Sequence, residues 1–261
     1  MVARTSVTGI VFVLCSMLCI ATAARGQGAA ATPGRFVSVA GERFVDGAGR
    51  HLLLHGVNVV DKSTNWSHYD WLDEAGCVAM KGWGFNCIRL GFTWASIEPE
   101  PGVYNEKCLE ELDKRVEWAG KNGIYVFLDM HQDLYSMKFS DGAPEWATLT
   151  DGKPHTAPGA VWSDAYFTSQ AVQAAFDNFY ANKPGPGGVG LQDRYAAAWK
   201  HVAEHFAANP TVIGYDLMNE PFAGSLVPEG FMTLLGTLVG EFAGEGGSKV
   251  MGAFEIIAQW G

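Results

Sequence analysis

The sequence predicts an α/β fold built on a parallel sheet, either a (β/α)8 barrel or an open doubly wound sheet. Strand-like apolar runs alternate with helix-like segments between residues 51 and 219, and this alternation is typical of parallel strands joined by crossover helices. No Gly-x-Gly-x-x-Gly or phosphate loop follows the first run, which disfavours a nucleotide-binding sheet. Polar side chains gather where the runs end, as they do at the active-site face of a barrel.

The first 24 residues have the layout of a signal peptide. A single cation, Arg4, precedes an apolar run over residues 10–20 and a small-residue cleavage site after Ala23 or Ala24. An uncleaved anchor helix is the alternative, because roughly 18 apolar residues can span a bilayer. We therefore expect a secreted or lumenal protein with a linker over residues 25–34 and one folded domain over residues 35–261.

Charge and cysteine content exclude several classes of protein. The net charge of −10 disfavours binding to nucleic acid. Beyond the signal peptide, Cys77, Cys87 and Cys108 are odd in number and lack metal-ligand spacing, so a disulfide framework is not indicated. We expect buried thiols, with one disulfide as the alternative, and neither a metal ion nor a cofactor.

The expected elements follow from periodicity and from turn residues. Alternating runs at residues 35–39 and 43–46 predict a β-hairpin that leads into a buried strand, HLLLHGVNVV. The run IYVFLDM lacks alternation, which predicts a parallel strand buried on both faces. A long loop over residues 132–170 holds several aromatic residues, and loops of that length are often functional. The expected strands are 51–60, 86–92, 124–130 and 211–219, and the expected helices are 70–81, one from the cap Asn105 to Gly123, 171–180 and 191–207.

Polar residues at the strand ends predict a catalytic mouth. Charged and amide side chains are costly to bury without partners, so packing alone does not explain them. The residues are His55 and Asn58 at the first strand, Arg89 within the second, His131 and Asp133 after the third, and Asn219 and Glu220 at the end of the fourth.

The sequence Asn-Glu-Pro after an apolar strand is typical of an acid catalyst in glycosidic cleavage. A Glu with a raised pKa can protonate the leaving oxygen, and Asn219 could hold the sugar 2-hydroxyl. Arg89 is always charged and could keep a neighbouring carboxylate ionised. The alternatives are that Glu220 merely starts a helix before Pro221 and that Arg89 forms a structural ion pair.

Other polar and aromatic residues are candidate sugar contacts. Lys62 follows the first strand and could hydrogen-bond sugar hydroxyls, or it could be a solvated surface lysine. A single His is often only a hydrogen-bonded core residue, but the place of His131 in the string DMHQD makes it a stronger candidate. Aromatic rings that could stack on a sugar or a lipid, or simply fill the core, are Trp66, Trp94, Trp146 and Trp162.

At these positions the chain resembles glycoside hydrolase family 5, in which an Arg lies on the second strand, a His follows the third and Asn-Glu ends the fourth. Within the family, the strings HGVNVVDKS, RLGFTWASIEPEPGVYN, LDMHQDLYS, GAPEWA and VIGYDLMNEPFAG are similar to endoglycoceramidases, which cleave the bond between glycan and ceramide. The resemblance implies the N-terminal half of a TIM barrel and a retaining β-glycosidase that contacts membrane lipid transiently. It makes Glu220 the acid/base, with Arg89, Asn219 and His131 beside it, and assigns sugar binding to Lys62, His131, Asp133 and Asn219.

The chain departs from the family pattern at its C-terminus. The resemblance implies a nucleophilic Glu at the end of a seventh strand, but too few residues follow Glu220 for further βα units of roughly 30 residues each. We therefore expect a fragment, a truncated gene model or a splice form, inactive as it stands, with Glu255 as the late candidate nucleophile. The alternatives are a β-glucanase or cellulase of the same family and a non-catalytic glycan-binding product.

Overall fold

The computed structural model describes residues 36–64, 72–156 and 161–226. These residues all belong to one unit of the chain, Gly34–Gly261. The expected signal peptide and linker, Trp66 and Glu255 lie outside the described residues. Within the described ranges, no helix combines the length and the apolar character that crossing a bilayer requires.

A small antiparallel sheet opens the described chain. Its strands β1 (Ser38–Ala40), β2 (Arg43–Val45) and β3 (His51–Leu52) pair in the order β1-β2-β3. The expected hairpin is therefore confirmed. The single strand expected over residues 51–60 is wrong, because this run divides between β3 and β4 (Gly56–Val60), which belong to different sheets.

Asn86 supplies the physical reason for this break. Its side chain accepts a hydrogen bond from the backbone nitrogen of His55 (2.7 Å) and donates one to the carbonyl of Leu53 (2.9 Å). The backbone between the two strands thus finds its partners in a side chain and needs no strand neighbour. At Gly56 a Cβ atom would lie 1.9 Å from the carbonyl oxygen of Cys87, so only glycine allows β4 to approach β5 this closely.

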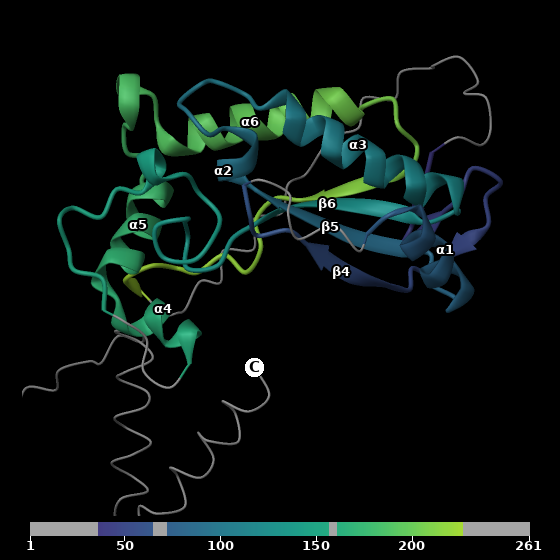
Figure 1. The fold of residues 1–261 in the computed structure, drawn as a ribbon, viewed down its shortest axis with the longest axis horizontal. Coiled ribbons are helices and arrows are strands. Elements are labelled where there is room, and N and C mark those ends of the chain that lie inside the picture. Colours follow the sequence, from purple (N-terminus) through teal and green to yellow (C-terminus); the bar gives the residue numbers. More distant parts are fainter. Residues whose placement is uncertain (1–35, 65–71, 157–160, 227–261) are drawn as a thin grey trace, which may run out of the picture. The chain divides into compact units, whose positions relative to one another are not determined.

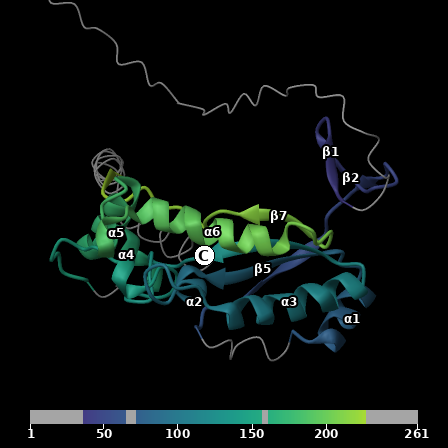
Figure 2. The same cartoon turned by 90° about the horizontal axis from the view of Figure 1, so that it is seen from above.

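The main sheet is parallel and has the strand order β4-β5-β6-β7. Because this order follows the chain without reversal, the sheet has no switch point of the doubly wound kind, and the (β/α)8 barrel expectation is confirmed over these strands. Figures 1 and 2 show α3 and α6 running along one side of the sheet, where a barrel carries its helices. The remaining strands and helices are β5 (Cys87–Thr93), β6 (Tyr125–His131), β7 (Val212–Asp216), α1 (Glu74–Gly82), α2 (Trp94–Ile97), α3 (Glu106–Lys121), α4 (Ala165–Thr168), α5 (Gln170–Tyr180), α6 (Leu191–Phe206) and the 3-10 helices η1 (Glu145–Ala147), η2 (Trp162–Asp164) and η3 (Pro186–Gly188).

The two faces of the main sheet differ in chemistry. One face is apolar, and its residues in β5 and β6 are at most 1% exposed; they are Ile88, Leu90, Phe92, Val126, Leu128 and Met130. The opposite face carries Arg89, Asp129 and His131, since side chains alternate along a strand. The expectation that β6 is buried on both faces is confirmed over its carboxyl-terminal half, where the buried residues include the charged Asp129 and His131.

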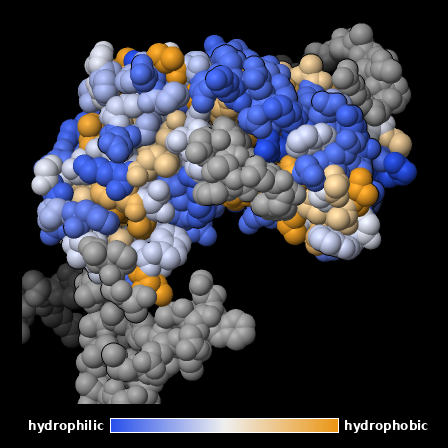
Figure 3. Space-filling model, viewed as in Figure 1, coloured by the Kyte–Doolittle hydropathy of each residue, from blue (hydrophilic) through white to orange (hydrophobic). Residues whose placement is uncertain are grey.

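The helices pack on the apolar face through regularly spaced residues. In α3, the side chains of Leu109, Leu112, Val116 and Ala119 are buried at spacings of three and four residues, and the positive φ of Gly123 (63°) ends this helical segment. The outward surfaces of α3 and α6 are mostly hydrophilic (Figure 3). The three thiols expected to be buried are buried and free; they are Cys77, Cys87 and Cys108.

Candidate active site

Arg89 is the centre of an ion-pair network at the carboxyl end of the sheet. Its Nε and Nη2 atoms both donate to Oδ2 of Asp216, at 2.9 and 2.7 Å, and Nη2 also donates to Oδ1 of Asn219 at 3.0 Å. Oδ1 of Asp129 lies 2.9 Å from Nη2 but is not aligned for a hydrogen bond, so this contact is an ion pair alone. Gly91 makes room for the network, since a Cβ there would lie 3.0 Å from the Asp129 carboxylate.

β7 ends at Asp216, so Asn219, expected as the last residue of this strand, lies beyond its end, and Glu220 does not directly follow the strand. The segment is held instead by α6, where Tyr195 and Trp199 donate to the carbonyl of Leu217 at 2.5 and 2.9 Å. The strand ends early because these side chains take the place of a strand partner for this carbonyl.

Gln132 fixes the backbone that carries the expected acid. Its Nε2 atom donates to the carbonyls of Asn219 (2.7 Å) and Glu220 (3.1 Å), and its own backbone carbonyl accepts from Nδ2 of Asn219 (3.1 Å). Glu220 is exposed and has a φ of 41°, a left-handed conformation that costs free energy in a residue with a Cβ. Such strain persists where surrounding contacts impose it, and it is often found at functional sites.

His131 lies between two buried carboxylates. Its Nδ1 atom is 2.9 Å from Oδ2 of Asp129, and its Nε2 atom is 3.6 Å from Oδ2 of Asp133. Burial acts to lower the pKa of His131, but the hydrogen bond to Asp129 and the nearby Asp133 carboxylate outweigh it and raise this pKa to about 9. The imidazole is therefore a cation at neutral pH, with a proton on each nitrogen.

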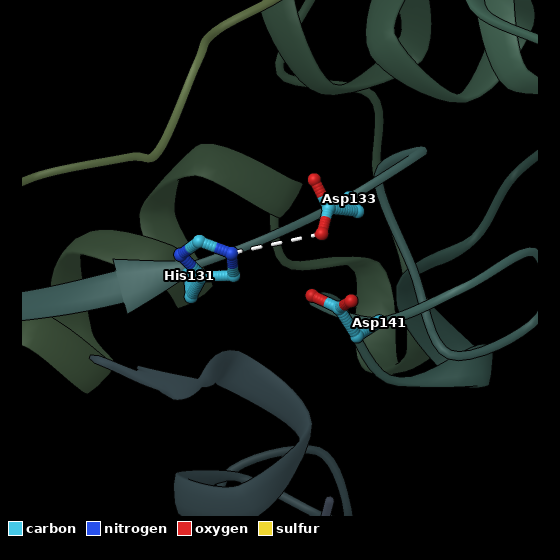
Figure 4. Close-up of side chains that lie close together, drawn as sticks. All are labelled: His131, Asp133 and Asp141. Atoms are coloured by element: carbon cyan, nitrogen blue, oxygen red, sulfur yellow. Dashed lines mark ion pairs between the residues drawn. The ribbon is translucent and has the colours of Figure 1, made fainter. Parts of the chain in front are cut away.

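Asp133 and Asp141 lie beside His131 (Figure 4), and together with Lys62 they form a second charged group. The Lys62 ammonium donates to Asp133 and lies 3.6 Å from Oδ2 of Asp141. Burial acts to raise the pKa of Asp133, but hydrogen bonds from His131 and Lys62 lower it overall. Burial raises the pKa of Asp141 to about 6, with the charge of Asp133 adding to the rise against the opposing Lys62.

The same group offers the donor set for a cation. One ligand atom from each of His131, Asp133 and Asp141 lies within 4.8 Å of the others, a set that transition metals accept. The ammonium of Lys62 already lies against both carboxylates, and the His131 imidazolium has no free lone pair for a metal. The arrangement is better suited to neutral polar hydroxyls, and the absence of a metal stays a prediction.

Some expected contacts lie elsewhere. His55 precedes β4 at the amino end of the strand, remote from the carboxyl ends where a barrel places its site, and Asn58 lies within the strand. Trp94 is 2% exposed, packs against Trp146 at 5.3 Å between ring centroids and donates to Glu98. A sugar-contact role for Trp94 is therefore wrong, whereas Trp146 is half-buried at the edge of the core and its role stays a prediction. Trp162 is 51% exposed, with the Lys62 ammonium 5.9 Å from its ring, and it stays a candidate contact.

Four polar residues of the site were absent from the sequence expectation: Asp129, Gln132, Asp141 and Asp216. Asp129 could have been found, since it lies two residues before His131 on the same face of the strand. Asp216 likewise stands three residues before Asn219 in a strand-end string. Asp141 carries no such signal, because a loop reversal brings it to the site.

Comparisons with known proteins agree with this geometry. Residues 45–228 match the family model described as cellulase (glycosyl hydrolase family 5). The chain is similar to an endoglycoceramidase of Hydra vulgaris, with 36% identity over 73% of this chain and 42% of the relative. It is also similar to an endoglycoceramidase of Cyanea nozakii, with 37% identity over 83% of this chain and 48% of the relative.

Solved structures give the same picture. Endo-glycoceramidase II from Rhodococcus sp., in complex with ganglioside GM3, superposes with a TM-score of 0.61 and 37% identity, covering 69% of this chain and 43% of the other. A lactosyl-enzyme intermediate of the same enzyme matches equally, with a TM-score of 0.61. The chain thus spans slightly less than half the length of the curated relatives that it matches.

Proposed function

This chain belongs to the cellulase family, glycosyl hydrolase family 5, and we propose that it carries the acid/base half of a retaining glycosidase acting on the glycan–ceramide bond of glycosphingolipids. The observation that carries the proposal is the convergence of Arg89, Asn219, His131 and the Lys62–Asp133 pair beside the segment that bears Glu220. The relatives support the substrate class, since two of them are endoglycoceramidases and a structural neighbour holds ganglioside GM3.

In this proposal Glu220 protonates the glycosidic oxygen as the bond to ceramide breaks. It then takes a proton from the water that hydrolyses the glycosyl-enzyme. Asn219, oriented by Arg89 and Gln132, holds the sugar 2-hydroxyl, an interaction that strengthens in the transition state. The lactosyl-enzyme intermediate of a structural neighbour supports the retaining course. The nucleophile is not assigned among the described residues, and Glu255 lies outside them.

The second sugar-binding group in the proposal is the pair of Lys62 and Asp133. The ammonium donates to sugar oxygens and the carboxylate accepts from sugar hydroxyls, a division of roles that their opposite charges allow. Trp162 stands at the edge of this pair with an exposed ring and would stack on a sugar or on the lipid.

Secretion is part of the same proposal. The signal-peptide layout of residues 1–24 would deliver the protein to the extracellular or lumenal side of membranes, where its lipid substrate faces it. Transient contact with membrane lipid follows from a ceramide-linked substrate.

Activity on fluorescent ganglioside and on β-glucan separates the proposed substrate class from the polysaccharide alternative. We expect the full-length protein to release glycan from ganglioside at a kcat/KM at least ~100-fold above that for β-glucan, because binding the lipid aglycone adds interactions that the glucan lacks. A preference for β-glucan would reject the glycolipid assignment. Glycan binding without turnover of either substrate would instead support a non-catalytic product.

Lys62→Ala and Asp133→Ala should each weaken binding of the free ganglioside oligosaccharide by about tenfold, the scale of a lost hydrogen bond to a charged group. Isothermal titration calorimetry measures this effect. The matched control is the surface pair Asp151 and Lys183, where the same substitutions should leave the affinity unchanged. Unaltered affinity in both site variants would remove this pair from the sugar site.

A further inference from the structure

We propose that Asp141 is a positioning residue of the sugar site: it draws the Lys62 ammonium away from Asp133 when a glycan binds, and so frees the Asp133 carboxylate for a sugar hydroxyl. The inference rests on the proposed function and adds to it a residue that does not contact the sugar but acts through Lys62. Asp141 is 2% exposed, and its Oδ1 atom has no hydrogen-bond partner among the described residues. A buried carboxylate with an unused acceptor beside a cation is a place to which that cation can move.

The backbone holds Asp141 in this place. Asp133 and Asp141 form an antiparallel bridge, each donating its N–H to the other's carbonyl at 3.2 Å. The chain reverses between these two residues, over residues 134–140. Directly after Asp141, Gly142 has a φ of 120°, and a Cβ there would lie 2.6 Å from both the Gln132 Cβ and the Tyr135 carbonyl oxygen. Only glycine allows this close approach, which keeps the returning chain, and with it Asp141, beside Asp133.

The Lys62 ammonium needs a second carboxylate as its partner when Asp133 binds a sugar hydroxyl. In the free site the Lys62 ammonium donates directly to Asp133, so a sugar hydroxyl that binds this carboxylate competes with the ammonium. Without compensation, separating the two charges in a half-buried site would oppose binding. With Oδ2 of Asp141 3.6 Å away, the ammonium keeps a carboxylate partner while Asp133 turns to the sugar.

The charge of Asp141, which the loop places against the Lys62 ammonium, also predicts how glycan binding depends on pH. Three charged groups face Asp141, namely Lys62, His131 and Asp133. Hydrogen bonds with charged partners raise the pKa values of Lys62 and His131 and lower that of Asp133, each against the effect of burial. Of these four groups Asp141 alone changes charge near pH 6, because burial raises its pKa to about 6.

The test is a double-mutant cycle on glycan affinity, measured by titration calorimetry at pH 7 with the free oligosaccharide of ganglioside GM3. Asp141→Asn keeps the backbone bridge and removes the charge, and we expect about tenfold weaker binding. Lys62→Met should weaken binding similarly, and adding Asp141→Asn to it should cost nothing more, since Asp141 acts through Lys62. Asp151→Asn, in the surface pair with Lys183, is the control and should bind like wild type.

Each result decides the proposal. Wild-type affinity in Asp141→Asn overturns the proposal. So does a tenfold loss caused by Asp141→Asn that is the same in the wild-type and the Lys62→Met backgrounds. Wild-type protein itself should lose affinity as the pH falls through about 6, a measurement that needs no variant to fold, and a flat profile also overturns it. If the wild type binds no oligosaccharide at any pH, the proposed function fails first. If Asp133→Ala weakens binding while Asp141→Asn does not, only the role of Asp141 fails.

Discussion

Glu220→Gln is expected to slow hydrolysis of ganglioside by the full-length protein at least ~100-fold, the scale of lost general-acid assistance. The amide has nearly the shape of the carboxyl group but cannot protonate the leaving oxygen. Gln132 holds residue 220 through its backbone carbonyl, at 3.1 Å, so the variant should keep the strained backbone and bind oligosaccharide normally. Steady-state kinetics and calorimetry measure the two effects separately.

An activated substrate sharpens this test. An aryl glycoside with an acidic phenol leaves with little protonation, so its glycosyl transfer should suffer much less than ganglioside hydrolysis in the same variant. Glu117→Gln, on the outer face of α3 where Glu117 pairs with Lys121, is the matched control and should react like wild type. Ganglioside turnover by Glu220→Gln within a few-fold of wild type would show that another group is the acid.

The sequence allowed the order of the main elements to be predicted because their signals are local. Apolar runs and residues spaced by three and four mark β5, β6 and α3 without reference to distant residues. Arg89 and Glu220 could be proposed for the same reason, since Arg89 lies in β5 and Glu220 shortly follows the apolar run that contains β7. The choice between barrel and doubly wound sheet could not be made from such signals, because strand order is a property of the pairing alone.

The errors have a common cause in contacts between distant residues. His55 was placed at the site because the break between β3 and β4 depends on the Asn86 side chain, 31 positions away from residue 55. Trp94 was a candidate sugar contact, but it is buried in the core, where its indole nitrogen donates to Glu98. Asp141 joins the site through the chain reversal over residues 134–140 and the close packing of Gly142 on Gln132. None of these arrangements has a periodic signature in the sequence.

Arg89→Met is expected to lower the free energy of unfolding by about 3–5 kcal/mol, the usual cost of removing one partner from a buried ion pair. Asp129 is fully buried and would keep His131 as its partner among the described residues, while Asp216 and Asn219 would lose their donor. Urea denaturation monitored by tryptophan fluorescence measures the change. Arg89→Lys keeps the charge but not the planar fork that reaches three residues, so its loss should be intermediate.

The control for this experiment is Arg50→Met. Arg50 also pairs with an aspartate, Asp46, but the arginine side chain is 80% exposed, and an exposed pair contributes at most about 1 kcal/mol. A loss of similar size in both variants would mean that the Arg89 network contributes no more than a surface pair. If Arg89→Met loses the expected stability, the segment carrying Asn219 and Glu220 should loosen with it, because Arg89 is the donor that ties Asn219 to β5. Hydrogen exchange at residues 217–220 should then rise above wild type, whereas unchanged protection there would show that α6 and Gln132 hold the segment without Arg89.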